Sequence, residues 1–94
     1  MDKRYAAISL REQIALRQQA IDAVLAHPEW SLADALRHIR VTLRLTTVEM
    51  AKLSGVSFRT LQDVEQGRSS GTIKTVNKLL AVLGLRLGVV RAVE

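Results

Sequence analysis

Apolar residues recur along most of this chain every three or four positions, the spacing that places side chains on one face of an α-helix. Each such run follows a serine or threonine that can accept a hydrogen bond from a free backbone N–H group. Most runs end at a glycine or a proline, which are common helix terminators. The sequence therefore predicts an all-α fold of five helices within residues 9–84.

The first predicted helix is the longest and the most separate from the others. It begins with a capping-box pattern, Ser9 to Glu12, and ends before Pro28, whose ring cannot continue a helix. Trp30 is expected to pack at the junction that follows, and His38 to lie on the surface. The residues expected on the buried stripe of this helix are Leu10, Ile14, Ile21, Val24 and Leu25.

Four shorter helices follow, and each has its own start and stop signals. Capping-box patterns begin at Ser31 and Thr46, whereas Ser57 and Thr72 can cap the last two helices. Glycines stand where a left-handed C-terminal residue is wanted, at positions 55, 67 and 84. The residues expected to face the core are Leu32, Ala35, Leu36, Ile39, Leu43, Leu61, Val64, Ile73, Val76, Leu79, Leu80 and Leu83.

The apolar pattern changes after Gly84 to an alternation with period two, which predicts a β-strand. Arg91 interrupts the series, whose members on one face are Leu85, Leu87, Val89 and Val93. A lone strand leaves its backbone groups unpaired, so the same strand of a second copy is the expected partner in a two-fold dimer. The alternative is an irregular tail that lies on the helices.

Composition narrows the classes of function. The chain contains no cysteine, which excludes disulfides, thiol catalysis and cysteine-ligated metal and favours a reducing cytoplasm. No apolar run approaches the ~20 residues of a spanning helix, so neither membrane insertion nor export is expected. The net charge of +5 falls entirely on residues 31–94, because the four basic and four acidic side chains of residues 1–30 cancel. This bias favours a polyanion as partner, although a solvated surface would also carry it.

The stretch from Val48 to Gly67 contains two short helices joined by a tight turn, the helix-turn-helix pattern. Ala51 is small enough to let the helices approach, and Gly55 supplies the turn. Leu61 and Val64 would hold the second helix against the core. The residues left on its outer side, which such a helix can present to base edges in a major groove, are Phe58, Arg59, Gln62 and Asp63.

Three segments of the chain match a known family: LRHIR, LTTVEMAKLSGVSFRTLQDVEQG and TIKTVNKLLAVLGL. Through them the chain resembles the Xre/lambda-repressor-like helix-turn-helix family over Leu36–Leu85. The LGLRL ending, followed by a predicted strand, is similar to the HipB-like antitoxin branch. This resemblance implies dimerisation through C-terminal strands and binding to operators upstream of the protein's own gene. It also implies a toxin partner, a HipA-type kinase in the named case.

The resemblance also assigns roles to single residues. It places Phe58, Arg59, Gln62 and Asp63 at the base-reading positions and implies an internal salt bridge between Arg40 and Glu65. The residues expected to hold the DNA backbone are Thr46, Thr47, Ser57, Arg68, Ser69 and Ser70. Two positions depart from the pattern: Thr47 is shorter than the usual glutamine, and Asp63 brings a carboxylate near phosphates. We expect Asp63 to accept from cytosine N4 or to pair with Arg59 in the free protein.

The predicted organisation is an N-terminal helical extension (1–30), a DNA-binding domain (31–84) and a dimerisation strand (85–94). The expected function is that of a bacterial, cytoplasmic and nucleoid-associated repressor that binds double-stranded operator DNA as a homodimer, as an autoregulating antitoxin would. The alternative is a protein-interaction module that restrains a toxin with little DNA binding. Neither a cofactor nor a metal is expected. Enzymatic activity is not expected either, because the chain has no paired-carboxylate, phosphate-loop or nucleophile–histidine pattern.

Overall fold

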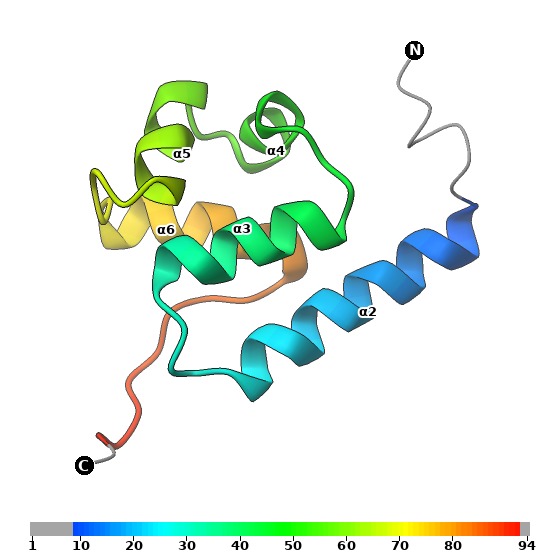
Figure 1. The fold of residues 1–94 in the computed structure, drawn as a ribbon, viewed down its shortest axis with the longest axis horizontal. Coiled ribbons are helices and arrows are strands. Elements are labelled where there is room, and N and C mark those ends of the chain that lie inside the picture. Colours follow the sequence, from blue (N-terminus) through cyan, green and yellow to red (C-terminus); the bar gives the residue numbers. More distant parts are fainter. Residues whose placement is uncertain (1–8, 93–94) are drawn as a thin grey trace.

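The computed structural model describes residues 9–92, and their regular structure is helical throughout. In chain order the helices are α2 (Leu10–Ala26), α3 (Leu32–Thr42), α4 (Thr47–Ser54), α5 (Phe58–Glu65) and α6 (Ile73–Leu80), followed by the 3₁₀ turn η1 (Ala81–Leu83). Figure 1 shows α3 between α5 on one side and α2 on the other. The prediction of an all-α fold with a long first helix is confirmed for these residues.

The predicted caps account for where the helices begin. Ser9, Ser31, Thr46, Ser57 and Thr72 each accept a hydrogen bond from the backbone N–H three residues later, at 3.0–3.1 Å. At Thr46 the capping box is complete, because the Glu49 carboxylate also accepts from the Thr46 N–H at 2.7 Å. At Ser31 the shorter Asp34 pairs with Arg37 at 3.2 Å instead, so that box is formed in one direction only.

The core lies among α3, α4, α5 and α6 and is almost entirely aliphatic, as expected from a chain with so few aromatic residues. Its large, fully buried side chains are Leu36, Ile39, Met50, Leu61, Val64, Val76 and Leu79. Two residues expected inside are exposed: Leu32 at 36% and Ile73 at 73%. Each is the first residue of its helix, one turn before the stripe that faces the core, so the helix has not yet reached the interior at that point.

Less of the first helix, α2, packs against this core than its apolar pattern predicts. Ala20 is fully buried, and Ile21 and Val24 pack partly against the core. Leu10, Ile14 and Leu25, expected on the same buried stripe, are 73%, 61% and 64% exposed. In Figure 1 the N-terminal half of α2 extends past the end of α3, so no described helix covers that side of it.

The predicted C-terminal strand is absent from the described part of the chain, since residues 85–92 form neither helix nor strand. Leu85 and Leu87 pack against the core, and the Leu87 N–H donates to Asn77 Oδ1 at 2.7 Å. Beyond them Val89 and Val90 are almost fully exposed. A strand needs a neighbouring strand for its ladder, and residues 9–92 offer none. Residues 85–87 therefore lie on the helices, which is the alternative to the predicted strand. Val93 lies outside the described residues.

The junction between α2 and α3 is an aromatic stack. The Trp30 ring lies parallel to that of His27, with centroids 4.3 Å apart, and tilted against that of His38 at 4.9 Å. Trp30 therefore packs at the junction as predicted. His38 is not the surface side chain expected, because its Nε2 atom is buried and has no hydrogen-bond partner among the described residues.

Candidate nucleic-acid interface

The turn between α4 and α5 is built on the carbonyl of Ala51, which accepts from the N–H groups of Gly55 and Val56 at 3.0 and 3.2 Å. Gly55 has φ +74°, and a Cβ added there would meet no atom within 4 Å. The glycine is therefore required for its left-handed backbone and not for space. This turn sets the direction in which α5 leaves α4.

An ion pair fixes the far end of α5. Arg40 Nε on α3 donates to both carboxylate oxygens of Glu65, at 3.1 and 2.9 Å, and Arg40 Nη1 donates to the Leu45 carbonyl at 3.3 Å. Glu65 is only 5% exposed, so its charge is neutralised inside the protein. The pair belongs to the scaffold, since it joins α3, the α3–α4 loop and α5.

The opposite face of α5 points outward at its beginning. Phe58 is 44% exposed, which is unusual for a large aromatic ring. Arg59 is exposed, and its side chain forms no hydrogen bond or ion pair within residues 9–92. Gln62 and Asp63, one turn later, are half-buried. The first turn of α5 therefore offers an apolar ring and an unpaired guanidinium to a partner.

Asp63 is paired, but not with Arg59 as we expected. Its carboxylate accepts from Nη2 and Nε of Arg68, at 2.8 and 3.0 Å, and its backbone carbonyl accepts from the N–H groups of Arg68 and Ser69. Gly67, with φ +74°, reverses the chain so that Arg68 returns over the end of α5. The pair balances the carboxylate and occupies a side chain expected to hold phosphate.

Several residues predicted to hold the DNA backbone already have roles within the protein. The Thr46 and Ser57 hydroxyls cap α4 and α5. The Ser69 hydroxyl accepts from the Gly71 N–H at 3.0 Å, and Ser70 is exposed beside it. Hydroxyl caps leave a helix start open to an anion, because the remaining backbone N–H groups still point outward.

Thr47 lies in a polar recess that joins the beginning of α4 to the later turns of α5. The recess has a volume of about 200 Å³ and is lined by Arg37, Arg40, Thr47, Gln62, Glu65 and Gln66. It thus brings together Thr47 and Gln62, two predicted DNA-contacting residues. Arg37 and Gln66 were not predicted; the available signal was that Arg37 precedes Arg40 by one helical turn.

Comparison with known protein families identifies the family to which this arrangement of helices belongs. The family model described as Helix-turn-helix domain matches residues 31–93, well over half of the chain. The chain belongs to this helix-turn-helix family. The match spans α3 to α6 and the C-terminal segment and leaves α2 outside. Helix-turn-helix domains of this Xre/lambda-repressor-like kind bind DNA and regulate transcription.

No curated protein and no solved structure matches the chain significantly. Within residues 9–92, no three His, Asp or Glu side chains gather where they could hold a metal ion. No helix of that range is both long and apolar enough to cross a bilayer. The helix-turn-helix domain thus supplies the functional assignment, and its residues 46–47 and 57–70 form the candidate interface.

Proposed function

We propose that the protein is a sequence-specific repressor that binds operator DNA as a dimer and uses α5 as its recognition helix. The observation that carries the proposal is the unpaired, exposed Arg59 beside the exposed Phe58 at the beginning of α5. In a helix-turn-helix protein the N-terminal residues of the second helix meet base edges in the major groove.

The chemistry of the outer face suits base reading. A guanidinium can donate two hydrogen bonds to O6 and N7 of guanine, which suits Arg59, and an apolar ring such as Phe58 can pack on a thymine methyl. Gln62 can read adenine, and Asp63 can accept from cytosine N4 once it leaves Arg68. The residues proposed to hold the DNA backbone are Thr46, Thr47, Ser57, Arg68, Ser69 and Ser70.

Dimerisation is proposed to occur through residues 85–93, paired as strands with a second copy. The exposed Val89 and Val90 support this, since apolar side chains beyond a packed segment favour a covering partner. The proposed contacts are Leu85, Leu87, Val89 and Val93. Such a dimer would place two recognition helices about one turn of DNA apart, ~34 Å.

The finer proposal is an autoregulating antitoxin, supported by the resemblance of the LGLRL ending to the HipB-like branch. Its partner would be a toxin of the HipA-type kinase class. The alternative, a module that restrains a toxin with little DNA binding, differs in one measurable respect. A repressor loses DNA affinity steeply as salt rises, because binding releases counterions from phosphates, and the alternative predicts no such binding.

The recognition role is tested by Arg59→Ala. We expect a loss of about 1–3 kcal/mol in binding to the DNA upstream of the protein's own gene, because the variant lacks the predicted guanine contact. Gel shifts with this DNA and with a scrambled duplex measure the loss. The control is Arg11→Ala, which removes another exposed arginine from α2. Unchanged operator affinity and base preference in Arg59→Ala would exclude α5 as the reader.

A further inference from the structure

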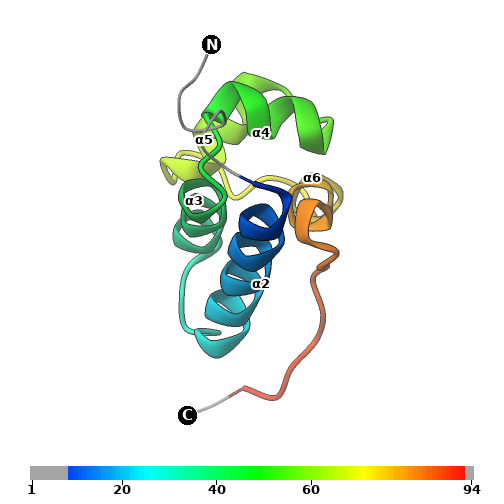
Figure 2. The same cartoon turned by 90° about the vertical axis from the view of Figure 1, so that its right-hand side faces the viewer.

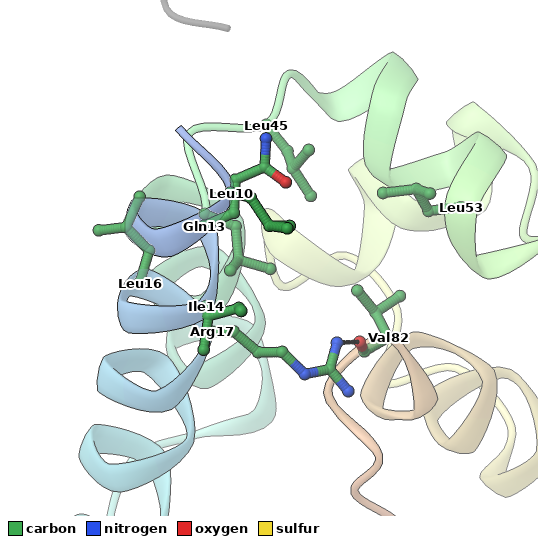
Figure 3. Close-up of a pocket in the computed structure, with 9 residues that line it drawn as sticks. Leu10, Gln13, Ile14, Leu16, Arg17, Leu45, Leu53 and Val82 are labelled. Carbon is green, nitrogen blue, oxygen red and sulfur yellow. Dashed lines mark hydrogen bonds between the residues drawn. The ribbon is translucent and has the colours of Figure 1, made fainter. Parts of the chain in front are cut away.

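An apolar groove lies between α2 and the helix-turn-helix domain (Figure 3). Leu10 and Ile14 form its α2 side, whereas Leu45, Leu53 and Val82 come from the domain. The groove has a volume of about 360 Å³, and most of its lining surface is apolar. It therefore differs in character from the polar recess beside α5.

The walls of this groove expose side chains that would ordinarily be covered. Leu10, Ile14 and Leu53 are 73%, 61% and 64% exposed. Ile14 lies one helical turn after Leu10, so the two present a continuous ridge. Exposed apolar side chains gathered in one groove are typical of a site that receives another apolar surface.

The charge of the groove restricts its occupant. Arg17 is the charged side chain among the described lining residues, and its Nη1 donates to the Val82 carbonyl at 2.6 Å across the groove. A guanidinium has five N–H donors, so most of those of Arg17 stay available for a carboxylate. The charged residues that adjoin lining residues in the sequence are mostly basic: Arg11, Arg44 and Lys52 against Glu12. An acidic occupant would therefore be favoured.

The chain's own remaining segments lack this complementary charge. Residues 85–94 carry Arg86 and Arg91 against Glu94, and residues 1–8 carry Lys3 and Arg4 against Asp2, so neither segment has a net negative charge. Helix α2 of a second copy has two basic and two acidic side chains, so it brings no net charge to meet Arg17. By charge, an acidic helix of a different protein fits the groove better than either terminal segment or α2 of a second copy.

We propose that the groove binds an amphipathic helix of a partner protein, with apolar residues at helical spacing and an acidic side chain that pairs with Arg17. Helix-in-groove binding of this kind uses anchors at i, i+3 or i+4, and i+7. This proposal rests on the proposed antitoxin role, because it assigns the binding surface for the toxin partner. Figure 1 shows α2 and α5 on opposite sides of α3.

The test uses the full chain and two synthetic amphipathic helical peptides of equal length and identical leucine stripe. Glutamates flank the stripe in one peptide and lysines in the other. Fluorescence anisotropy of the labelled peptides should show at least about tenfold tighter binding of the glutamate peptide, as expected for a desolvated charge pair. Arg17→Glu should reverse that preference, and Ile14→Gln and Leu53→Gln should weaken binding of both peptides.

The matched control is Leu25→Gln, a change at an equally exposed leucine of α2 outside the groove. Circular dichroism melts verify that each variant is folded. Equal binding of the two peptides, or no effect of the groove substitutions, would overturn the proposal. The proposal would also be overturned if sedimentation equilibrium shows self-association that Ile14→Gln abolishes, because a second copy would then be the occupant of the groove. If removal of residues 1–8 strengthens binding of the glutamate peptide, that segment is the occupant of the groove instead.

Gel shifts with operator DNA on the same variants keep the two proposals separate. Ile14→Gln and Leu53→Gln should leave DNA affinity unchanged, because neither residue belongs to the proposed DNA interface. Peptide binding without DNA binding would contradict the repressor role alone. DNA binding without peptide preference would contradict the groove proposal alone.

Discussion

The pairing of Asp63 shows how Arg68, a single residue of the following loop, changes the electrostatics of the outer side of α5. The Asp63 carboxylate is held by Arg68, which leaves Arg59 unpaired. Helical spacing is sufficient to predict that Arg59 and Asp63 share the outer side of α5. It does not predict the partner of Asp63, because this depends on the left-handed backbone at Gly67, which returns Arg68 to the helix.

Replacement of Asp63 by asparagine should tighten DNA binding. The change removes a carboxylate near phosphates and releases Arg68, so non-specific affinity should rise about three- to tenfold at low salt, with a steeper salt dependence. Titrations at several KCl concentrations measure both effects. Asp22→Asn, on α2, is the control, since Asp22 pairs only with Gln18 in the described part of the chain. Weaker binding with lost preference for a C·G pair would show instead that Asp63 reads cytosine.

At the scale of elements, the helix-turn-helix is the part that local sequence specifies best. Caps at Thr46 and Ser57, a small residue at Ala51 and a glycine at position 55 are all local signals. The caps and Gly55 have their predicted roles in the structure, and Ala51 is buried. The first helix behaves differently. Its capping and its stop are local and were predicted, but which of its apolar residues are buried depends on where α3 ends beside it.

The turn can be tested by Gly55→Ala. Gly55 has φ +74° and open space around its missing Cβ, so alanine should cost about 1–2 kcal/mol of unfolding free energy through backbone strain alone. Urea denaturation followed by circular dichroism measures the loss. Gly88→Ala is the matched control, because Gly88 also has open space but no positive φ. Equal stability of the two variants would show that the turn does not depend on the left-handed residue.

At the scale of the whole molecule, the described chain combines two surfaces of opposite character. The beginning of α5 offers an arginine that is unpaired within residues 9–92, whereas the side of α2 and residues Val89 and Val90 offer apolar side chains. Figure 2 shows α2 and the C-terminal segment on the same side of the molecule, away from α4 and α5. The proposed DNA-reading side of α5 therefore lies apart from the proposed contact surfaces of α2 and the C-terminal segment.

The proposed dimer leads to a prediction about the C-terminal segment. Deletion of residues 88–94 should convert a dimer to a monomer in sedimentation velocity, while Leu85 and Leu87 keep their core contacts. Operator binding should weaken as well, because two linked half-sites bind more tightly than one. Val89→Asp should weaken dimerisation more than Val90→Asp, since position 89 belongs to the predicted apolar face of the strand. A dimer that survives the deletion would exclude this segment as the interface.

The sequence by itself determined the helices, their caps and the outward-facing residues of α5, because these depend on side chains a few positions apart. Tertiary structure decided the rest. Whether the C-terminal alternation forms a strand depends on a neighbouring strand for its backbone. In the described part of a single chain, the Leu87 N–H donates to Asn77 Oδ1 instead and no strand forms. The groove beside α2 could not be predicted either, since helical periodicity marks Leu10 and Ile14 as apolar but not whether another element reaches them.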